Sequence, residues 1–526
     1  MKKLFSVLIF CFSVFNFHAN EVTSDKFFTF HFANDFPLLH PQLIYENTTM
    51  QTVTATNEGL FAYDPYSALP VKALAENFST SGKTWRFNLR EDAFFENGDP
   101  ITAETIKMSW LNLLSPEVDF AFASLLDCIQ GAYDYRTGKN KDSNSVAIYV
   151  EDKYTLSVYL TEPTPHLASI LCNPAFAAIH PSQLEYALNY LKAQKTITAK
   201  DAFIPISSGP FKIKKYDEKQ ITFVKNEKYW DAKSIKLKGL ILRMDLSEEE
   251  QAKSFNNGEL HWTKNATLTD VVGTRIINYA PMFATSFFFF NVNDKNVAND
   301  KLRKALLFAI PYEKLRGDFQ LGAETLIFPL AGYPEVAGVS EQNLNQAKKL
   351  INELKLKKDE KILTIKIYDY EFQKKLATIL KEAWEKLGFT VNIKLIPSGA
   401  SLQPSLATND YSVSSITWIA DFADPIAMLE LFRGNSTLNE SGWSDKHFDA
   451  LLSKAGNETD ISKRYKILAE AETYLLDKGL LIPLAYSFSL NVIDTGEIGG
   501  WFPNALDVHP FKFIYFKTRE LAPGFI

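Results

Sequence analysis

Residues 362–396 contain three successive segments: ILTIKIYDY at 362–370, EFQKKLATILKEAWEKLG at 371–388 and TVNIKLI at 390–396. The first and last have the composition of strands, whereas the middle segment repeats apolar residues at helical spacing. Strand and helix alternate in the same way over much of the later half of the chain. We therefore predict an α/β fold with a largely parallel, doubly wound lobe. Its other expected elements are helices at 343–354, 425–432 and 461–478 and a strand at 411–419.

The earlier half of the chain is richer in hairpins. Residues 84–90, TWRFNLR, alternate as a strand, and Thr102 is placed to cap a helix. Strand–turn–strand patterns follow at 145–160 and at 207–231. The chain has 526 residues, which is too long for one hydrophobic core, and it shows no repeat and no low-complexity linker. These features predict several lobes that are woven together.

The first residues have the pattern of a secretory signal. In MKKLFSVLIFCFSVFNFHA two lysines precede a short apolar run, so we expect residues 1–19 to be a signal peptide and the mature protein to be periplasmic. Cys11 offers an alternative, a lipid anchor, although the bulky Phe10 before it does not suit such a signal. The formal net charge of −6 argues against nucleic acid as a partner.

The chain contains no pattern typical of a catalytic or metal site. No nucleophile elbow, zinc-protease helix, phosphate loop or dinucleotide fingerprint occurs, and the eight histidines are scattered. We therefore expect no catalytic residue, no metal and no cofactor. Cys128 and Cys172 allow either one disulfide or two buried thiols.

Two carboxylates lie close together in WIADFADP, residues 418–425. Asp424 precedes Pro425 at a predicted helix start, so its carboxylate should cap free backbone N–H groups. Asp421 has no such local role. It follows a strand, where open α/β sheets hold ligands, and beside Trp418 an uncompensated carboxylate would attract an ammonium group. An intramolecular salt bridge is the alternative for Asp421.

An ordered set of motifs resembles the extracytoplasmic solute-binding proteins of peptide ABC importers, the oligopeptide- and dipeptide-binding family (solute-binding family 5). The most specific segment is NLREDAFFENGDPITAE at 88–104. The others, in chain order, are EGLFAYDP, YTLSVYLTEPTPHLASILCNPAF, SSGPFKIKKY, ITFVKNEKYWDA, NNGEL, NDKLRKALLFAI and WIADFADP. Together they cover nearly the whole chain after the signal.

The resemblance implies a periplasmic-binding-protein-like type II fold, with two lobes, a hinge and an extra small domain. The first ligand-binding lobe would be discontinuous and the second continuous, with ligand enclosed between them by hinge closure. The implied boundaries are 20–57, 200–282 and 488–526 for domain I, 58–199 for the extra domain II, and 283–487 for domain III.

The resemblance also implies a function: delivery of short peptides to ABC permease and ATPase subunits by a monomer that is not an enzyme. Asp421 would pair with the peptide's α-amino group and Trp418 would line the pocket. Ser415 stands where binders of longer peptides often carry a basic residue, and Glu46 stands near the position of another acid. Tyr45 and Phe422 complete the candidate ligand-binding residues. Alternatives are other cargo (a murein-derived peptide, a nickel complex or haem) and a secreted hydrolase.

Overall fold

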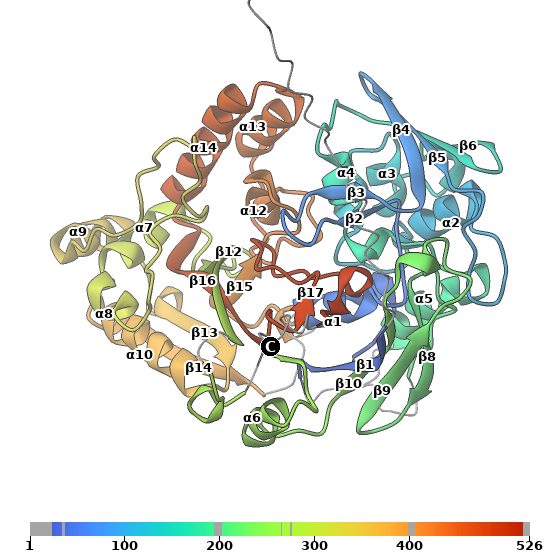
Figure 1. Cartoon of the computed structure of the whole chain (residues 1–526). Helices are drawn as coiled ribbons and strands as arrows, with labels where there is room; N and C mark the ends of the chain where they lie inside the picture. Colours follow the sequence, from blue (N-terminus) through green and yellow to red (C-terminus); the bar gives the residue numbers. More distant parts are fainter. Residues whose placement is uncertain are drawn as a thin grey trace, which may run out of the picture.

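The structure is a computed structural model that describes residues 24–33, 37–193, 202–264, 266–273, 276–397 and 405–518. The expected signal peptide and Cys11 lie outside these ranges. Within them, no helix combines the length and the apolar character that a membrane span requires. The fold is mixed α/β, as predicted, and is organised around one large sheet (Figure 1).

The large sheet has ten strands in the order β14-β13-β15-β12-β16-β11-β1-β10-β9-β8. In chain order they are β1 (Ser24–His31), β8 (Phe211–Tyr216), β9 (Gln220–Lys225), β10 (Leu237–Arg243), β11 (Trp262–Thr263), β12 (Ile277–Phe290), β13 (Ile362–Tyr368), β14 (Thr390–Ile396), β15 (Val413–Ile419) and β16 (Leu481–Ile493).

The prediction of a largely parallel lobe is wrong for the middle of this sheet. β13 is parallel to β14 and β15, as the strand–helix–strand pattern indicates. β12, however, is antiparallel to both β15 and β16. The reason is that β16, which we did not predict, returns after the last long helix and pairs along almost the full length of β12.

The described residues also form three smaller sheets, from hairpins and short segments. A four-stranded sheet has the order β4-β5-β7-β6, and two-stranded sheets join β2 with β3 and β17 with β18. Their bounds are β2 (Phe61–Tyr63), β3 (Pro70–Lys72), β4 (Ala75–Ser81), β5 (Thr84–Leu89), β6 (Ile148–Asp152), β7 (Thr155–Tyr159), β17 (Ile498–Gly499) and β18 (Tyr515–Phe516).

The helices cover the sheets with their apolar sides. In α10 the residues Leu376, Leu380 and Trp384 are buried, and the indole N–H of Trp384 donates to the backbone oxygen of Leu306 at 3.0 Å. The α-helices are α1 (Asn47–Val53), α2 (Ala103–Leu113), α3 (Ala132–Arg136), α4 (Leu167–Ile170), α5 (Leu184–Ala193), α6 (Glu248–Asn256), α7 (Asp300–Phe308), α8 (Tyr312–Arg316), α9 (Leu344–Leu354), α10 (Glu371–Glu385), α12 (Ile426–Leu429), α13 (Lys446–Asn457) and α14 (Ile461–Asp477).

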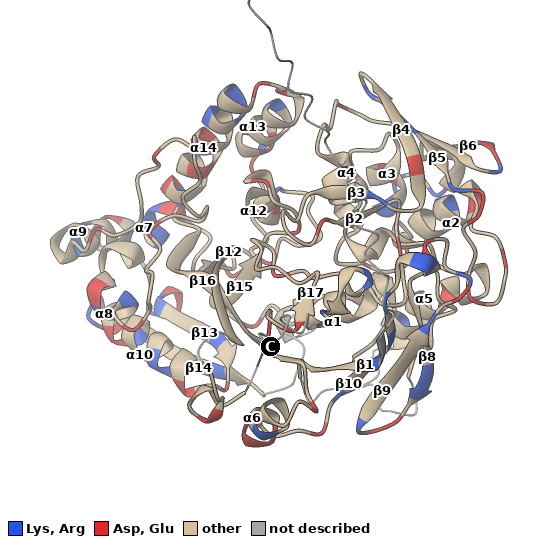
Figure 2. Ribbon diagram, in the orientation of Figure 1, with Lys and Arg blue, Asp and Glu red and all other residues tan. Residues whose placement is uncertain are grey.

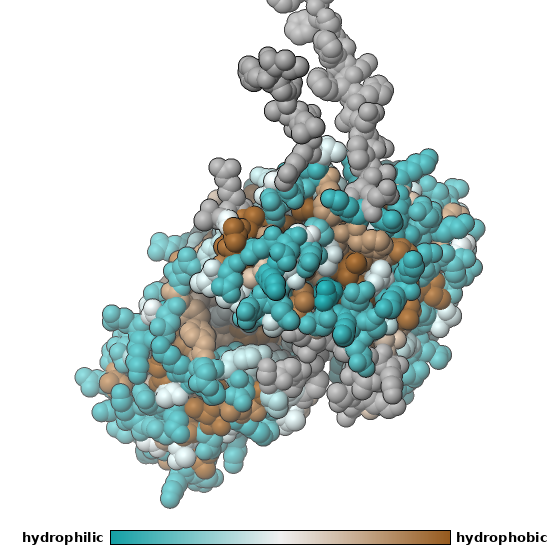
Figure 3. Space-filling model, turned by 60° about the horizontal axis from the view of Figure 1, so that its bottom comes forward, coloured by the Kyte–Doolittle hydropathy of each residue, from teal (hydrophilic) through white to brown (hydrophobic). Residues whose placement is uncertain are grey.

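The long strands β12 and β16 connect two parts of the molecule. In Figure 1 they lie between β13, β14 and α10 on one side and β1 and β8–β10 on the other. Their pairing shifts register between Pro281 and Thr285. Figure 3 shows the surface hollowed between the lobe at the left of the view and the larger body beside it.

Several hydrogen bonds cross from residues 58–199 to residues 283–487. The hydroxyl of Tyr63 donates to the backbone oxygen of Asp421 at 3.0 Å. The hydroxyls of Ser124 and Thr437 lie 2.9 Å apart. Arg136 donates to the backbone oxygen of Asn435 at 2.9 Å. We call this set of contacts the seam.

Candidate functional site

The loop that carries Asp421 begins where β15 ends. The backbone N–H of Ala420 still bonds to the Phe283 oxygen at 2.9 Å, which extends the pairing of β15 with β12 by one step. The bond from Tyr63 then fixes the backbone of Asp421 itself. Hydrogen bonds therefore hold the backbone of the loop at Ala420 and Asp421, which fixes the point from which the Asp421 side chain extends.

Asp424 has the structural role that the sequence predicts. Its carboxylate accepts the backbone N–H of Ile426 at 3.0 Å at the start of α12. It also forms a two-point ion pair with Arg464, whose guanidinium is 6% exposed. The helix is shorter than predicted, because α12 ends at Leu429 and continues as a 3-10 turn over Glu430–Phe432.

The Asp421 carboxylate is not paired in this way. It keeps some contact with solvent but lies deep in the protein, and burial alone raises its pKa from 3.8 to about 7. No hydrogen bond or ion pair reaches its carboxylate from any residue that the structure describes, so the alternative of an intramolecular salt bridge is not realised there. A buried carboxylate without a partner is costly, and a cation that enters beside it removes the cost.

Tyr45 and Trp418 form an aromatic wall next to this carboxylate. Their ring centroids are 6.1 Å apart at an interplanar angle of 74°. Trp418 is 5% exposed, and its buried indole N–H has no acceptor among the described residues. Burial raises the pKa of Tyr45 well above its ordinary value, and the nearby charges of Glu440 and Asp421 contribute to the shift. The site thus holds an acceptor and a donor that are both without partners.

Glu440 is a second acid of this site, and the sequence analysis did not identify it. Burial alone raises the pKa of Glu440 from 4.5 to about 7. Like Asp421, its carboxylate has no hydrogen bond or ion pair within the described ranges. Glu440 lies in a loop without a periodic pattern, so no local signal in the sequence distinguishes it from a surface glutamate.

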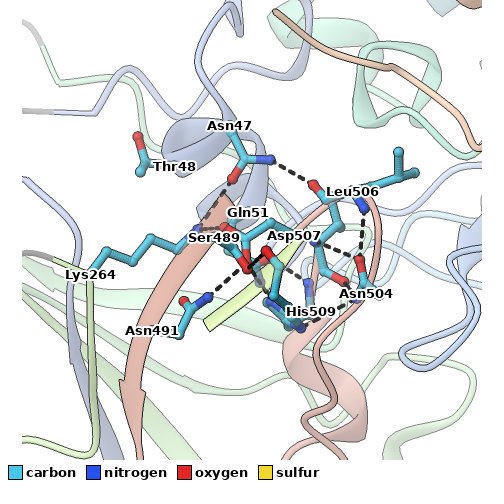
Figure 4. A network of polar contacts seen from close by, with 12 residues as sticks. Asn47, Thr48, Gln51, Lys264, Ser489, Asn491, Asn504, Leu506, Asp507 and His509 are labelled. Atoms are coloured by element: carbon cyan, nitrogen blue, oxygen red, sulfur yellow. Dashed lines mark hydrogen bonds and ion pairs between the residues drawn. The ribbon is translucent and has the colours of Figure 1, made fainter. Parts of the chain in front are cut away.

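A polar network holds the segment that carries Tyr45 and Glu46 (Figure 4). The Asn47 side chain donates to the Leu506 backbone oxygen at 3.2 Å and accepts from Lys264 at 3.3 Å. Lys264 forms an ion pair with Asp507 at 2.6 Å. His509 lies 3.0 Å from the same aspartate. The start of α1, and with it the wall residue Tyr45, is therefore anchored to the C-terminal segment.

The other predicted residues are distributed around the site. Glu46 is exposed at the N-terminus of α1. Burial is the main cause of the raised pKa of Tyr368, and the negative charge of Glu46 adds to it. Phe422 is 1% exposed and stacks on His166 with centroids 5.5 Å apart, so it belongs to the core. The Ser415 hydroxyl donates to Gln373 at 3.4 Å. Strand alternation places Ser415 and Trp418 on opposite faces of β15.

No lysine or arginine among the described residues forms an ion pair with either acid of the site. Figure 2 shows many of the Lys and Arg residues on outer helices and hairpins. Arg433, which is near Glu440 in sequence, is paired with Glu430 at 2.6 Å. Cys128 and Cys172 are free thiols. No group of three or more potential metal ligands occurs among the residues described.

Comparisons with known proteins identify the chain's relatives. The model of the family "Bacterial extracellular solute-binding proteins, family 5 Middle" matches residues 70–440. The oligopeptide-binding protein OppA of Bacillus subtilis is 29% identical over 91% of this chain and 90% of its own length. The dipeptide-binding protein DppE of the same organism is 26% identical over 91% of this chain and 89% of its own.

Solved structures of oligopeptide-binding proteins have a similar fold. A crystal structure of a periplasmic oligopeptide-binding protein, OppAIV, from Borrelia burgdorferi superposes with a TM-score of 0.78 at 24% identity, over 93% of this chain and 99% of that one. This likeness confirms the predicted fold class, and the family match covers more than half of the sequence. The chain belongs to family 5 of the bacterial extracellular solute-binding proteins.

Proposed function

We propose that this protein is the substrate-binding component of a peptide ABC importer and that Asp421 holds the α-amino group of a short peptide. The observation that carries the proposal is the Asp421 carboxylate: deep in the protein, in contact with solvent, and without a cation among the described residues. A peptide ammonium group is the simplest partner for it, because it brings one charge and several hydrogen-bond donors.

The aromatic wall fits the same ligand. Trp418 and Tyr45 offer apolar area that accepts varied side chains, and the indole N–H of Trp418 can donate to a peptide carbonyl. A peptide bound along a strand edge obtains most of its affinity from main-chain hydrogen bonds, which do not depend on its sequence. Relatives named as oligopeptide- and dipeptide-binding proteins support this cargo.

We also propose the three-domain division, with 58–199 as an extra domain between the parts of domain I and with 283–487 as the second lobe. The register shift between Pro281 and Thr285 supports a boundary near residue 282, and the separate four-stranded sheet supports the extra domain. The protein would act in the periplasm as a monomer, bring its peptide to the permease and ATPase subunits, and catalyse no reaction.

Calorimetry on the Asp421→Asn variant tests the proposed function. We expect tri-alanine to bind the unaltered protein and to lose at least tenfold in affinity with the variant, since one hydrogen-bonded charge pair in a partly dry site contributes about 2 kcal/mol or more. Asp359→Asn is the matched control, because Asp359 is exposed and lies in the same lobe. Equal affinities for Asp421→Asn and the control would contradict the role of Asp421.

A further inference from the structure

We propose that Glu440 selects peptides that carry a lysine side chain, by forming a second ion pair in a cavity beside the Asp421 site. This inference rests on the proposed peptide-binding function and goes beyond it, because it assigns a class of side chain to a residue that the sequence motifs do not mark. The ligand would then be a peptide with two cations, one at its amino terminus and one on a side chain.

The loop that carries Glu440 is built to hold one conformation. The Glu440 backbone oxygen accepts the Tyr411 hydroxyl at 3.2 Å. On either side of it, the Asn439 side chain bonds to the Arg433 and Trp443 oxygens at 3.1 and 2.7 Å, and the backbone oxygen of Ser441 accepts the N–H of Val292 at 2.8 Å. A carboxylate on such a fixed loop is presented in a fixed place without a partner of its own.

The immediate surroundings of Glu440 are apolar. It lines a cavity of about 20 Å³ together with Ser441 and the apolar residues Phe287, Phe289, Ile416, Leu431, Phe432 and Leu438. This volume holds about one water molecule, so it has room for the ammonium group of a lysine but not for the stem. The methylene groups would lie at the apolar mouth of the cavity while the charge meets the carboxylate.

Strand β15 connects this cavity to the proposed peptide site. Ile416, which lines the cavity, and Trp418 lie two residues apart on β15 and so on the same face of the strand, and the Trp418 ring packs against that of Tyr45. The charges of Glu440 and Asp421 both add to the increase that burial causes in the pKa of Tyr45. The unpartnered indole N–H of Trp418 against the same ring is independent evidence that a ligand completes this region.

A carboxylate without a cation in an apolar cavity disfavours an acidic or neutral side chain there. Bringing a negative side chain to this place would add like-charge repulsion, and a neutral one would leave the Glu440 charge unpaired in an apolar setting. A lysine side chain removes both costs. The predicted preference for a cationic side chain therefore follows both from the Glu440 carboxylate and from the lack of a described cation beside it.

Calorimetry with matched tripeptides tests this selection. Alanine tripeptides with one lysine at the first, second or third position are compared with peptides that carry norleucine, the uncharged analogue of the lysine stem, at the same position. We expect lysine to bind at least tenfold tighter than norleucine at one position or more. In Glu440→Gln this ratio should fall below about threefold, as expected when a desolvated charge pair is lost.

The controls separate this inference from the proposed function. Glu382→Gln removes the same charge from an exposed position on α10 and should keep the ratio of the unaltered protein. If tri-alanine binds and depends on Asp421 but lysine gives no advantage, or if the advantage survives in Glu440→Gln, the selection by Glu440 is wrong and the peptide-binding function stands. If none of the peptides binds, both proposals fail.

Discussion

Asp507 and Asp421 both lie deep in the protein, but a lysine pairs with the Asp507 carboxylate, whereas no described residue pairs with that of Asp421. Asp507 accepts from Lys264 at 2.6 Å and from the Asn491 side chain at 2.9 Å, with His509 at 3.0 Å (Figure 4). Although burial acts to raise the pKa of Asp507, these partners hold it well below its ordinary value. For Asp421 burial acts alone and raises the pKa to about 7.

The difference separates residues that hold the fold together from those that we propose bind a ligand. In the Asp507 network the side chains of Lys264, Asn491 and His509 all meet the Asp507 carboxylate, and the network fixes α1 against the C-terminal segment. At Asp421 and Glu440 the backbone is fixed equally well, but the carboxylates have no partner among the described residues. Perturbed and unsatisfied acids of this kind mark functional sites more often than structural ones.

The largest effect is expected when the paired aspartate loses its charge. Asp507→Asn leaves the Lys264 ammonium group, 12% exposed, without its anion and should lower the free energy of unfolding by about 3–5 kcal/mol. Chemical denaturation followed by circular dichroism measures it. The double variant Lys264→Met/Asp507→Asn should recover much of the loss, because no charge is then left buried. A loss below about 1 kcal/mol in the single variant would contradict the structural role of the pair.

An intermediate effect is expected from pH on peptide affinity. In the empty protein the Asp421 carboxyl, with a pKa of about 7, holds its proton below that pH, and only the ionised form pairs with an ammonium group. Affinity for tri-alanine should therefore fall roughly fivefold from about pH 7.5 to about pH 6, because the acid takes up its proton while the peptide amine is mostly protonated throughout. Calorimetry in buffers of different ionisation enthalpy should detect proton release at neutral pH. A flat profile over this range would count against the role of Asp421.

An effect of opposite sign is expected on stability when the unpaired aspartate is neutralised. The folded pKa of Asp421 lies above the ordinary 3.8, so the cost of its ionisation accumulates as pH rises towards 7 and is complete above it. Asp421→Asn should thus raise the free energy of unfolding at about pH 8, by at most about 4 kcal/mol, the limit set by the pKa shift, and change it little at about pH 4. Destabilisation at pH 8, as expected for Asp507→Asn, would show that Asp421 has a structural partner.

Local patterns were sufficient for much of the fold. The α10 segment with its flanking strands, the capping of α2 by Thr102 and the role of Asp424 at α12 follow from residue spacing, and the structure confirms them. β16 escaped prediction because LIPLAYSFSLNVI, buried on both faces for much of its length, lacks strict alternation. α13 was also missed, although Asp445 caps it.

The site was predictable only in part, because its defining property is non-local. A sequence can show that Asp421 has no local partner, but the pair between Asp424 and Arg464 joins residues that no spacing rule connects. Glu440 enters the site through the packing of a loop beside Tyr45 and Tyr411. Whether a carboxylate is paired depends on the completed fold.

The composition of the seam has a consequence for opening and closing. Among the described residues, no ion pair joins 283–487 to the rest of the chain. The charged groups Arg136 and Asp127 pair with each other on one side of the seam and meet only the backbone oxygen and the amide of Asn435 on the other. If the two sides part as proposed, water can replace the bonds of the seam without either charge losing its counter-ion. The equilibrium between open and closed empty protein should then depend only weakly on ionic strength.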